Sequence, residues 1–136
     1  MTNPESLVKG YLASGDRGDL DDLGRYLHDD VILHDPSGRY MRGLERERET
    51  WRTSRAAMSD LRHDVKEVVS SGSVVAARIT VLGTLHGPFA GVSAEAGSFE
   101  VDQAIFMHLV DGKVQEMWTI VDTGSFYRQV GAYPAQ

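Results

Sequence analysis

The stretch at residues 31–40, VILHDPSGRY, runs from apolar residues directly into a histidine, an aspartate and a proline. An aspartate before a proline often starts a turn through its own side chain. A carboxylate with its usual pKa of about 3.9 is a weak base at neutral pH, but an apolar wall beside it raises that value. A base held there can remove a proton from a carbon next to a carbonyl. Asp35 is therefore either a turn residue or a general base.

Its neighbour His34 raises two further possibilities, a second polar group in a pocket and a metal site. Adjacent strand residues face opposite sides, so His34 joins Asp35 in one pocket only if a bulge intervenes. The potential metal ligands in this region are His28, Asp29, Asp30, His34 and Asp35. They contain no H-x-H or H-x-x-x-H pair, and a site of two histidines and one carboxylate needs a third ligand from elsewhere. We expect no metal and no cofactor.

The composition limits the classes of protein to which the chain can belong. With 136 residues, 41% of them apolar, it predicts one globular domain over residues 1–136. The absence of cysteine excludes disulfides, thiolate zinc sites and cysteine nucleophiles. Without a signal pattern or an apolar run of membrane-spanning length, we expect a soluble, cytoplasmic protein with no membrane partner. A net charge of −6, and arginines that alternate with glutamates over residues 42–55, argue against a nucleic-acid partner.

The first elements that must position Asp35 are helical. Asn3 is a good N-cap and Pro4 suits a first helical turn, so we expect a helix that ends near Ser14. Its apolar stripe consists of Leu7, Val8, Tyr11 and Leu12. A second short helix is expected after an Asp19 cap.

Asp35 itself lies at the end of a predicted strand, residues 29–35, which Pro36 stops. From Leu44 to about Met58 the chain is strongly charged, and Leu44, Trp51 and Met58 are seven residues apart. This spacing predicts a helix that lays a narrow apolar seam on a sheet.

The remaining chain is rich in strand-forming residues. Four long runs, residues 61–70, 73–85, 98–110 and 113–122, are separated by short turn segments or a Gly/Pro/Ala-rich loop. Consecutive strands so close together pair antiparallel. The predicted fold is α+β, with helices on one face of a curved sheet and a mostly apolar pocket between them.

Two segments resemble known families. Residues 83–134, with the elements GTLHGPFAG and DGKVQEMWTIVDTGSFYRQVGA, are similar to the C-terminal half of the SnoaL-like polyketide cyclases of the NTF2-like superfamily. The N-terminal half resembles the ketosteroid isomerases of the same superfamily, with a tyrosine seven residues before GDLD and an acid in a DP dipeptide. The resemblance implies an NTF2-like cone, a mainly antiparallel sheet on three N-terminal helices. It also implies Asp35 as the base and Tyr11 as the hydrogen-bond donor.

The departures from these families concern two facing positions. Where the polyketide cyclases carry a histidine and an aspartate, this chain has Ile105 and Thr119. Ile105 also replaces the protonated aspartate of the isomerases, and the loss of one such donor costs about 10²–10³ in rate. The loss of both positions argues against the family's usual aldol closure in its usual form and favours a changed reaction, such as a different ring closure, a dehydration, or addition of water or oxygen.

The last hairpin decides which residues share a face with Ile105. With a three-residue turn, at residues 110–112 or 111–113, odd-numbered residues of both strands face the pocket, whereas a two-residue turn mixes the faces. The predicted pocket wall is then Gln103, Ile105, Met107, Met117, Thr119 and Val121, and the outward set is Phe106, His108, Glu116, Trp118 and Asp122. Met107, Met117 and Trp51 are either core residues or an adaptable wall for a flat apolar ligand.

We expect a small enzyme of polyketide-type biosynthesis that cyclises or isomerises a hydrophobic carbonyl compound. Asp35 would move the proton, and Tyr11, with Thr119 or His34, would bind the enolate oxygen. The alternatives are a non-catalytic binding protein for a hydrophobic metabolite, or a family member that hydroxylates, dehydrates or hydrolyses. Exposed Phe106, Trp118 and Ile120 favour a homodimer through the outer sheet face. His86 lies in a loop whose register decides whether it reaches the pocket, and His63 is interpreted as an ordinary strand residue.

Overall fold

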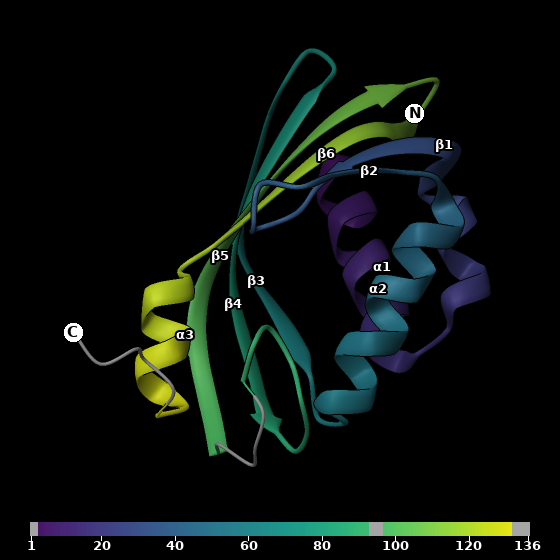
Figure 1. Ribbon diagram of the computed structural model, residues 1–136. Helices are drawn as coiled ribbons and strands as arrows, with labels where there is room; N and C mark the ends of the chain where they lie inside the picture. The colour runs from purple at the N-terminus through teal and green to yellow at the C-terminus, as the bar shows by residue number, and fades with distance from the viewer. Residues whose placement is uncertain (1–2, 93–96, 132–136) are drawn as a thin grey trace.

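The computed structural model describes residues 3–92 and 97–131, which form a curved sheet with helices packed on it (Figure 1). In chain order the elements are α1 (Pro4–Arg17), the 3-10 helix η1 (Leu20–Arg25), β1 (Leu27–His34), β2 (Tyr40–Arg42), α2 (Leu44–Ala57), β3 (Arg62–Ser71), β4 (Val74–Leu85), β5 (Gly97–Val110), β6 (Lys113–Val121) and α3 (Thr123–Gln129). The strand order is β2-β1-β6-β5-β4-β3, antiparallel throughout except for the parallel pair β1 and β6. The predicted α+β architecture is confirmed.

Helix α1 begins where the sequence predicts and ends later than predicted. The Asn3 side chain accepts hydrogen bonds from two free backbone N–H groups of the first turn, at 2.9 and 3.2 Å. The helix continues past Ser14 to Arg17, and Gly18, with a φ of 78°, ends it in the left-handed conformation that glycine adopts without strain. The added residues bring Asp16 beside the start of β3.

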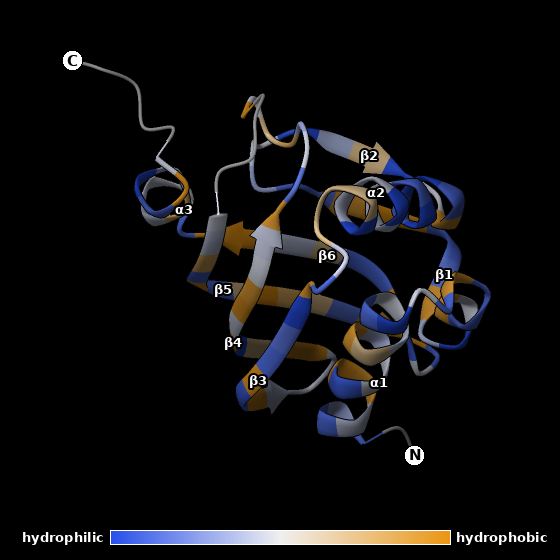
Figure 2. Cartoon of the chain, turned by 90° about the horizontal axis from the view of Figure 1, so that it is seen from below, coloured by the Kyte–Doolittle hydropathy of each residue, from blue (hydrophilic) through white to orange (hydrophobic). Residues whose placement is uncertain are grey.

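The core lies between the concave face of the sheet and the helices α1 and α2. Along β4 the side chains alternate in burial, and Val75, Ala77, Ile79 and Val81 are buried on the core side. Figure 2 shows both helices on the same side of the sheet and the change between hydrophobic and hydrophilic residues along the strands. This two-residue period is that of a sheet with one covered face.

The hairpin of β5 and β6 has the predicted faces but not the predicted turn. The turn consists of Asp111 and Gly112 alone, with φ values of 52° and 80°, as a two-residue hairpin turn requires. A register shift beyond His108 then inserts one extra residue into β6. This bulge restores the odd-numbered pairing, so that Ile105 faces Thr119.

The sequence pattern does not predict two short elements. Strand β2 has three partly or fully exposed residues and pairs with the end of β1. Helix α3 follows Asp122, which was expected to continue the last strand and instead accepts a hydrogen bond from the N–H of Ser125 at 3.0 Å. On α3 the buried Phe126 packs edge-on against Phe99 of β5, with ring centroids 5.0 Å apart.

Candidate functional site

A cavity of about 1080 Å³ lies between the concave face of the sheet, the helices α1 and α2, and the start of α3. This volume is at the upper end of the range for small-molecule sites. Apolar side chains form most of the wall. Three of the ionisable lining groups have buried side chains, namely Tyr11, Glu47 and His63, and the others are partly or fully exposed, namely His34, Asp35, Arg39, Arg46, Glu49 and Tyr127.

Glu47 of α2 is the buried carboxyl group of this cavity and is only 5% exposed. Its Oε2 accepts two hydrogen bonds, from the hydroxyl of Tyr11 on α1 and from Nε1 of Trp51 at 3.2 Å. The rings of Tyr11 and Trp51 are packed edge to face with centroids 5.9 Å apart. No described residue hydrogen-bonds Oε1, so this oxygen remains the place where Glu47 can bind or release a proton.

Burial raises the pKa of Glu47 to about 7, against the lowering effect of the hydrogen bonds from Tyr11 and Trp51. Burial and the nearby charge of Glu47 also raise the pKa of Tyr11 well above its usual value, so its hydroxyl stays protonated and donates. A carboxyl with a pKa near neutrality can both take and give a proton at neutral pH. Such perturbed groups in a cavity are typical of functional sites.

Sequence reasoning missed Glu47 because it stands in a run of alternating charges. A signal was nevertheless present. Residues 44, 47 and 51 are spaced i, i+3 and i+7, so Glu47 lies on the same helical face as the buried Leu44 and Trp51. A carboxylate on an apolar stripe is a candidate for a perturbed pKa.

Tyr11 lies in the cavity wall, as the role of a donor requires, but its hydroxyl donates to Glu47. The predicted contact between Tyr11 and a substrate oxygen stays a prediction. The structure shows that the buried carboxyl group of Glu47 accepts the hydrogen bond from this hydroxyl.

His63 also lines the cavity, which corrects its interpretation as an ordinary strand residue. It is the second residue of β3, and its side chain is 8% exposed. Both its backbone N–H and its Nδ1 are hydrogen-bonded to the Asp16 carboxylate, at 2.8 and 2.7 Å. Its ring packs edge-on against Trp51, with centroids 5.2 Å apart.

Asp35 lies at the rim of the cavity and organises the turn that follows β1. Its Oδ1 accepts hydrogen bonds from the N–H and hydroxyl of Ser37 and from the N–H of Arg39, and its Oδ2 from Nε of Arg39. Partial burial tends to raise the pKa of Asp35, but these hydrogen bonds outweigh it and hold the pKa below its usual value. The carboxylate is a weaker base than Glu47, and its predicted role as the base stays a prediction.

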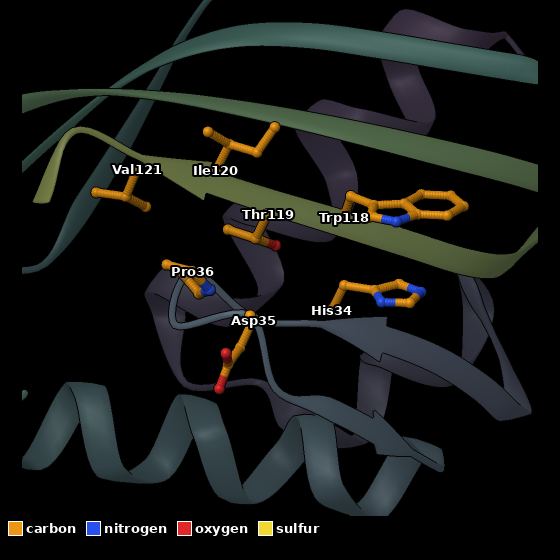
Figure 3. A pocket seen from close by; sticks show the side chains of 8 residues that line it. His34, Asp35, Pro36, Trp118, Thr119, Ile120 and Val121 are labelled. Atoms are coloured by element: carbon orange, nitrogen blue, oxygen red, sulfur yellow. The ribbon is translucent and has the colours of Figure 1, made fainter.

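His34 lies beside a hollow of about 320 Å³ at the end of β1 (Figure 3). Its ring stacks on Trp118 with centroids 4.8 Å apart and an interplanar angle of 2°, and its Nε2 is 2.7 Å from Glu116. In Figure 3 the two rings lie side by side, and the Asp35 side chain points away from them, toward α2. The ring of His34 therefore contacts Trp118 and Glu116, two residues that the sequence predicts on the outer face of the sheet.

The predicted apolar wall lines the cavity with one exception. The lining residues include Trp51, Gln103, Ile105, Met117 and Thr119. The exception is Met107, whose predicted place in the pocket wall is wrong. Its side chain is fully buried among core residues and does not line the cavity. Within the described ranges, Gln103 Oε1 is the one buried side-chain oxygen or nitrogen without a hydrogen-bond partner. This oxygen is enclosed by its neighbours and is not open to the cavity.

Residues 3–92 and 97–131 contain no group of three or more histidines and carboxylates arranged to hold a metal ion. His86 is exposed and does not line the cavity. None of the helices in these ranges is long and apolar enough to cross a membrane.

Comparisons with known proteins show the family and the fold of the chain. The family model of SnoaL-like polyketide cyclases matches residues 5–130. Among solved structures, TsrD from Streptomyces laurentii has a TM-score of 0.84 at 28% identity over 94% of each chain. IdmH from Streptomyces antibioticus, a proposed polyketide cyclase, has a TM-score of 0.83 at 26% identity over 95% of this chain and 99% of its own. A comparison with curated protein sequences finds no match.

A more distant structure identifies the fold. A protein from Catenulispora acidiphila with a ketosteroid isomerase-like fold, solved with trimethylamine, has a TM-score of 0.78 at 16% identity, over 96% of this chain and 95% of its own. The likeness concerns the fold alone. It confirms the predicted NTF2-like cone.

Proposed function

Because the chain belongs to the SnoaL-like polyketide cyclase family, we propose that it is an enzyme that cyclises or isomerises a hydrophobic carbonyl compound of polyketide type. The observation that carries this proposal is the buried Glu47 carboxyl in the wall of a large apolar cavity, with its pKa raised to about 7. Ring closure and isomerisation of carbonyl compounds both depend on moving a proton to or from carbon next to the carbonyl.

Glu47 would exchange that proton through Oε1, because Oε2 is held by Tyr11 and Trp51. The two donors fix the direction of the carboxyl group, so we assign Tyr11 and Trp51 as positioning residues. Apolar neighbours such as Ile105 and Met117 would hold the ring system of the substrate. Thr119, on the same wall, would donate to its oxygen.

Asp35 is the second candidate for the proton transfer. It lies at the rim of the same cavity, but four hydrogen-bond donors already occupy its oxygens. Each donor stabilises the charged carboxylate and so weakens it as a base. We therefore propose Glu47 ahead of Asp35.

The test is deuterium uptake from D₂O at the α-carbon of flat apolar ketones and β-keto thioesters, with 2-tetralone as the first probe. We expect the wild-type protein to accelerate uptake and Glu47→Gln to lose about 10²–10⁴-fold of the catalysed rate, the usual contribution of a general acid or base. Quenching of tryptophan fluorescence should show unchanged probe binding. The control is Glu45→Gln, because Glu45 is an exposed carboxylate on the same helix.

Two outcomes would contradict the proposal. Full activity in Glu47→Gln would remove Glu47 from the reaction. Tight binding of the probes without any acceleration by the wild-type protein would favour the alternative function, a binding protein for a hydrophobic metabolite.

A further inference from the structure

The pair Asp16 and His63 forms a second polar unit, distinct from Glu47, of which His63 lines the cavity and Asp16 lies behind it. Asp16 lies near the end of α1 and His63 at the start of β3, elements that pack against each other. One carboxylate oxygen accepts from the His63 backbone N–H and the other pairs with Nδ1. This double attachment fixes both the backbone and the ring of His63.

The attachment also fixes the chemistry of the ring. A carboxylate 2.7 Å from Nδ1 requires a proton on that nitrogen. The neutral ring then carries its free lone pair on Nε2. No described residue hydrogen-bonds Nε2, and this atom is not among the fully buried polar atoms without a partner. His63 is among the residues that line the cavity.

Trp51 brings this unit next to Glu47. Its Nε1 donates to Glu47 at 3.2 Å, and its ring packs on His63 with centroids 5.2 Å apart. The groups that face His63 are Asp16 from α1, Trp51 from α2 and the apolar Val81 from β4, and Arg55 of α2 donates to the backbone carbonyl of Asp16. An imidazole and a carboxyl group thus both contact one indole.

We infer that His63 is the general base of this cavity, positioned by Asp16, and that Glu47 is its complementary acid. This inference rests on the proposed function. Nε2 of His63 takes the proton from the carbon next to the carbonyl. The carbanion forms the new carbon–carbon bond, or shifts its double bond, and the oxygen or carbon that becomes negative takes the proton of Glu47. Solvent returns the proton from His63 to Glu47, so no oxidant or other reactant is needed.

This assignment also indicates the substrate class. A base and an acid on two sides of one indole suit a carbonyl compound that loses a proton at one atom and gains one at another. We therefore assign the ligand as a carbonyl compound that is flat and apolar enough to lie against the mostly apolar wall.

The test uses His63→Asn in the full chain, with the same deuterium uptake assay. Asparagine retains a donor toward Asp16 but has no group at the position of Nε2. We expect a loss of about 10²–10⁴-fold in catalysed uptake with unchanged probe binding. If His63→Asn does not fold, His63→Gln replaces it, because the glutamine oxygen accepts a hydrogen bond but takes no proton.

The pH profile gives an independent readout. We expect the wild-type kcat/KM to fall with rising pH as Glu47 loses its proton. This decrease should vanish in Glu47→Gln. Nitrogen-15 NMR should show the Nδ1–H form of His63 in the wild type and its loss in Asp16→Asn.

The two proposals fail in different ways. Full uptake in His63→Asn beside a collapse in Glu47→Gln would overturn the role of His63 and leave the proposed function standing. Full uptake in both variants would overturn both. An Nε2–H form of His63 in the wild-type protein would also contradict the inference.

Discussion

Glu47 shows how one helix position can change the chemistry of an ordinary side chain. The usual pKa of a glutamate is 4.5, and burial beside Tyr11 and Trp51 raises that of Glu47 to about 7. Glu45 lies on the exposed side of the same helix, where hydrogen bonds from Arg52 and Arg48 hold its pKa below the usual value. The local surroundings, not the residue type, make Glu47 a candidate acid and base.

This shift predicts a dependence of stability on pH. Between pH 4.5 and about pH 7 the folded protein keeps a proton on Glu47 that the unfolded chain has released. The free energy of unfolding should therefore fall as the pH rises through this window, by on the order of 3 kcal/mol. Urea unfolding at several pH values should show that Glu47→Gln lacks this decrease. Parallel curves for the two proteins would contradict the prediction.

Asp35 allows a second prediction at the same scale. In Asp35→Asn the oxygen that accepts from Arg39 Nε is lost, so the turn should weaken by about 1 kcal/mol. Turnover should persist, because we place the proton transfer at Glu47. Thermal unfolding and the uptake assay measure the two effects. A collapse of turnover with binding intact would instead restore Asp35 as the base.

At the scale of the elements, the contact between α1 and α2 sets the geometry of the cavity. Gly15 of α1 lies directly under the Trp51 ring, and a Cβ built at this position would overlap the indole. Trp51 in turn donates to Glu47 and packs on His63. The small residue on α1 is therefore what lets the indole reach both polar groups.

We expect Gly15→Ala to cost about 1–3 kcal/mol, as overpacking does, although alanine is the better helix former. It should also weaken catalysis, because the displaced indole no longer holds Glu47. The matched control is Gly24→Ala, whose added Cβ would meet its nearest neighbour at an ordinary 3.5 Å. Chemical unfolding and the uptake assay provide the measurements. Equal stability of the two variants would argue against the contact.

Most of the elements could be predicted from the sequence because their signals are local. A helix cap predicted α1, the spacing of apolar residues predicted α2, and strand-forming runs with turn residues between them predicted the four long strands. The pairing of Ile105 with Thr119 was right although the turn was wrong, since the bulge in β6 has no clear sequence signal. Glu47 and His63 were missed because their partners, Tyr11 and Asp16, are 36 and 47 residues away in the chain. Such contacts depend on tertiary packing.

At the scale of the whole molecule, the outer face of the sheet exposes large apolar side chains to solvent. Phe106 is 43% exposed and Ile120 56%, and Trp118 lies in the same region on β6. Exposed apolar patches of this kind often mark contact with another protein. We propose that two copies of the chain pair through this face, as the sequence already indicated.

The prediction is a dimer at micromolar concentration by light scattering. Ile120→Glu should shift it toward the monomer, because a charge in the centre of an apolar contact is costly to bury. Val110→Glu is the control, since Val110 is similarly exposed but lies beside the hairpin turn. A wild-type monomer under these conditions would contradict the proposed pairing.

The most direct test of the role of Glu47 is to measure the pKa of its carboxyl group in the intact protein. Carbon-13 NMR of the glutamate carboxyl groups, assigned with Glu47→Gln, gives its pKa without any substrate. We expect one carboxyl resonance that titrates at about pH 7 and is absent from the variant. A spectrum in which the Glu47 carboxyl titrates near the usual glutamate value of 4.5 would contradict its role in proton transfer in this cavity.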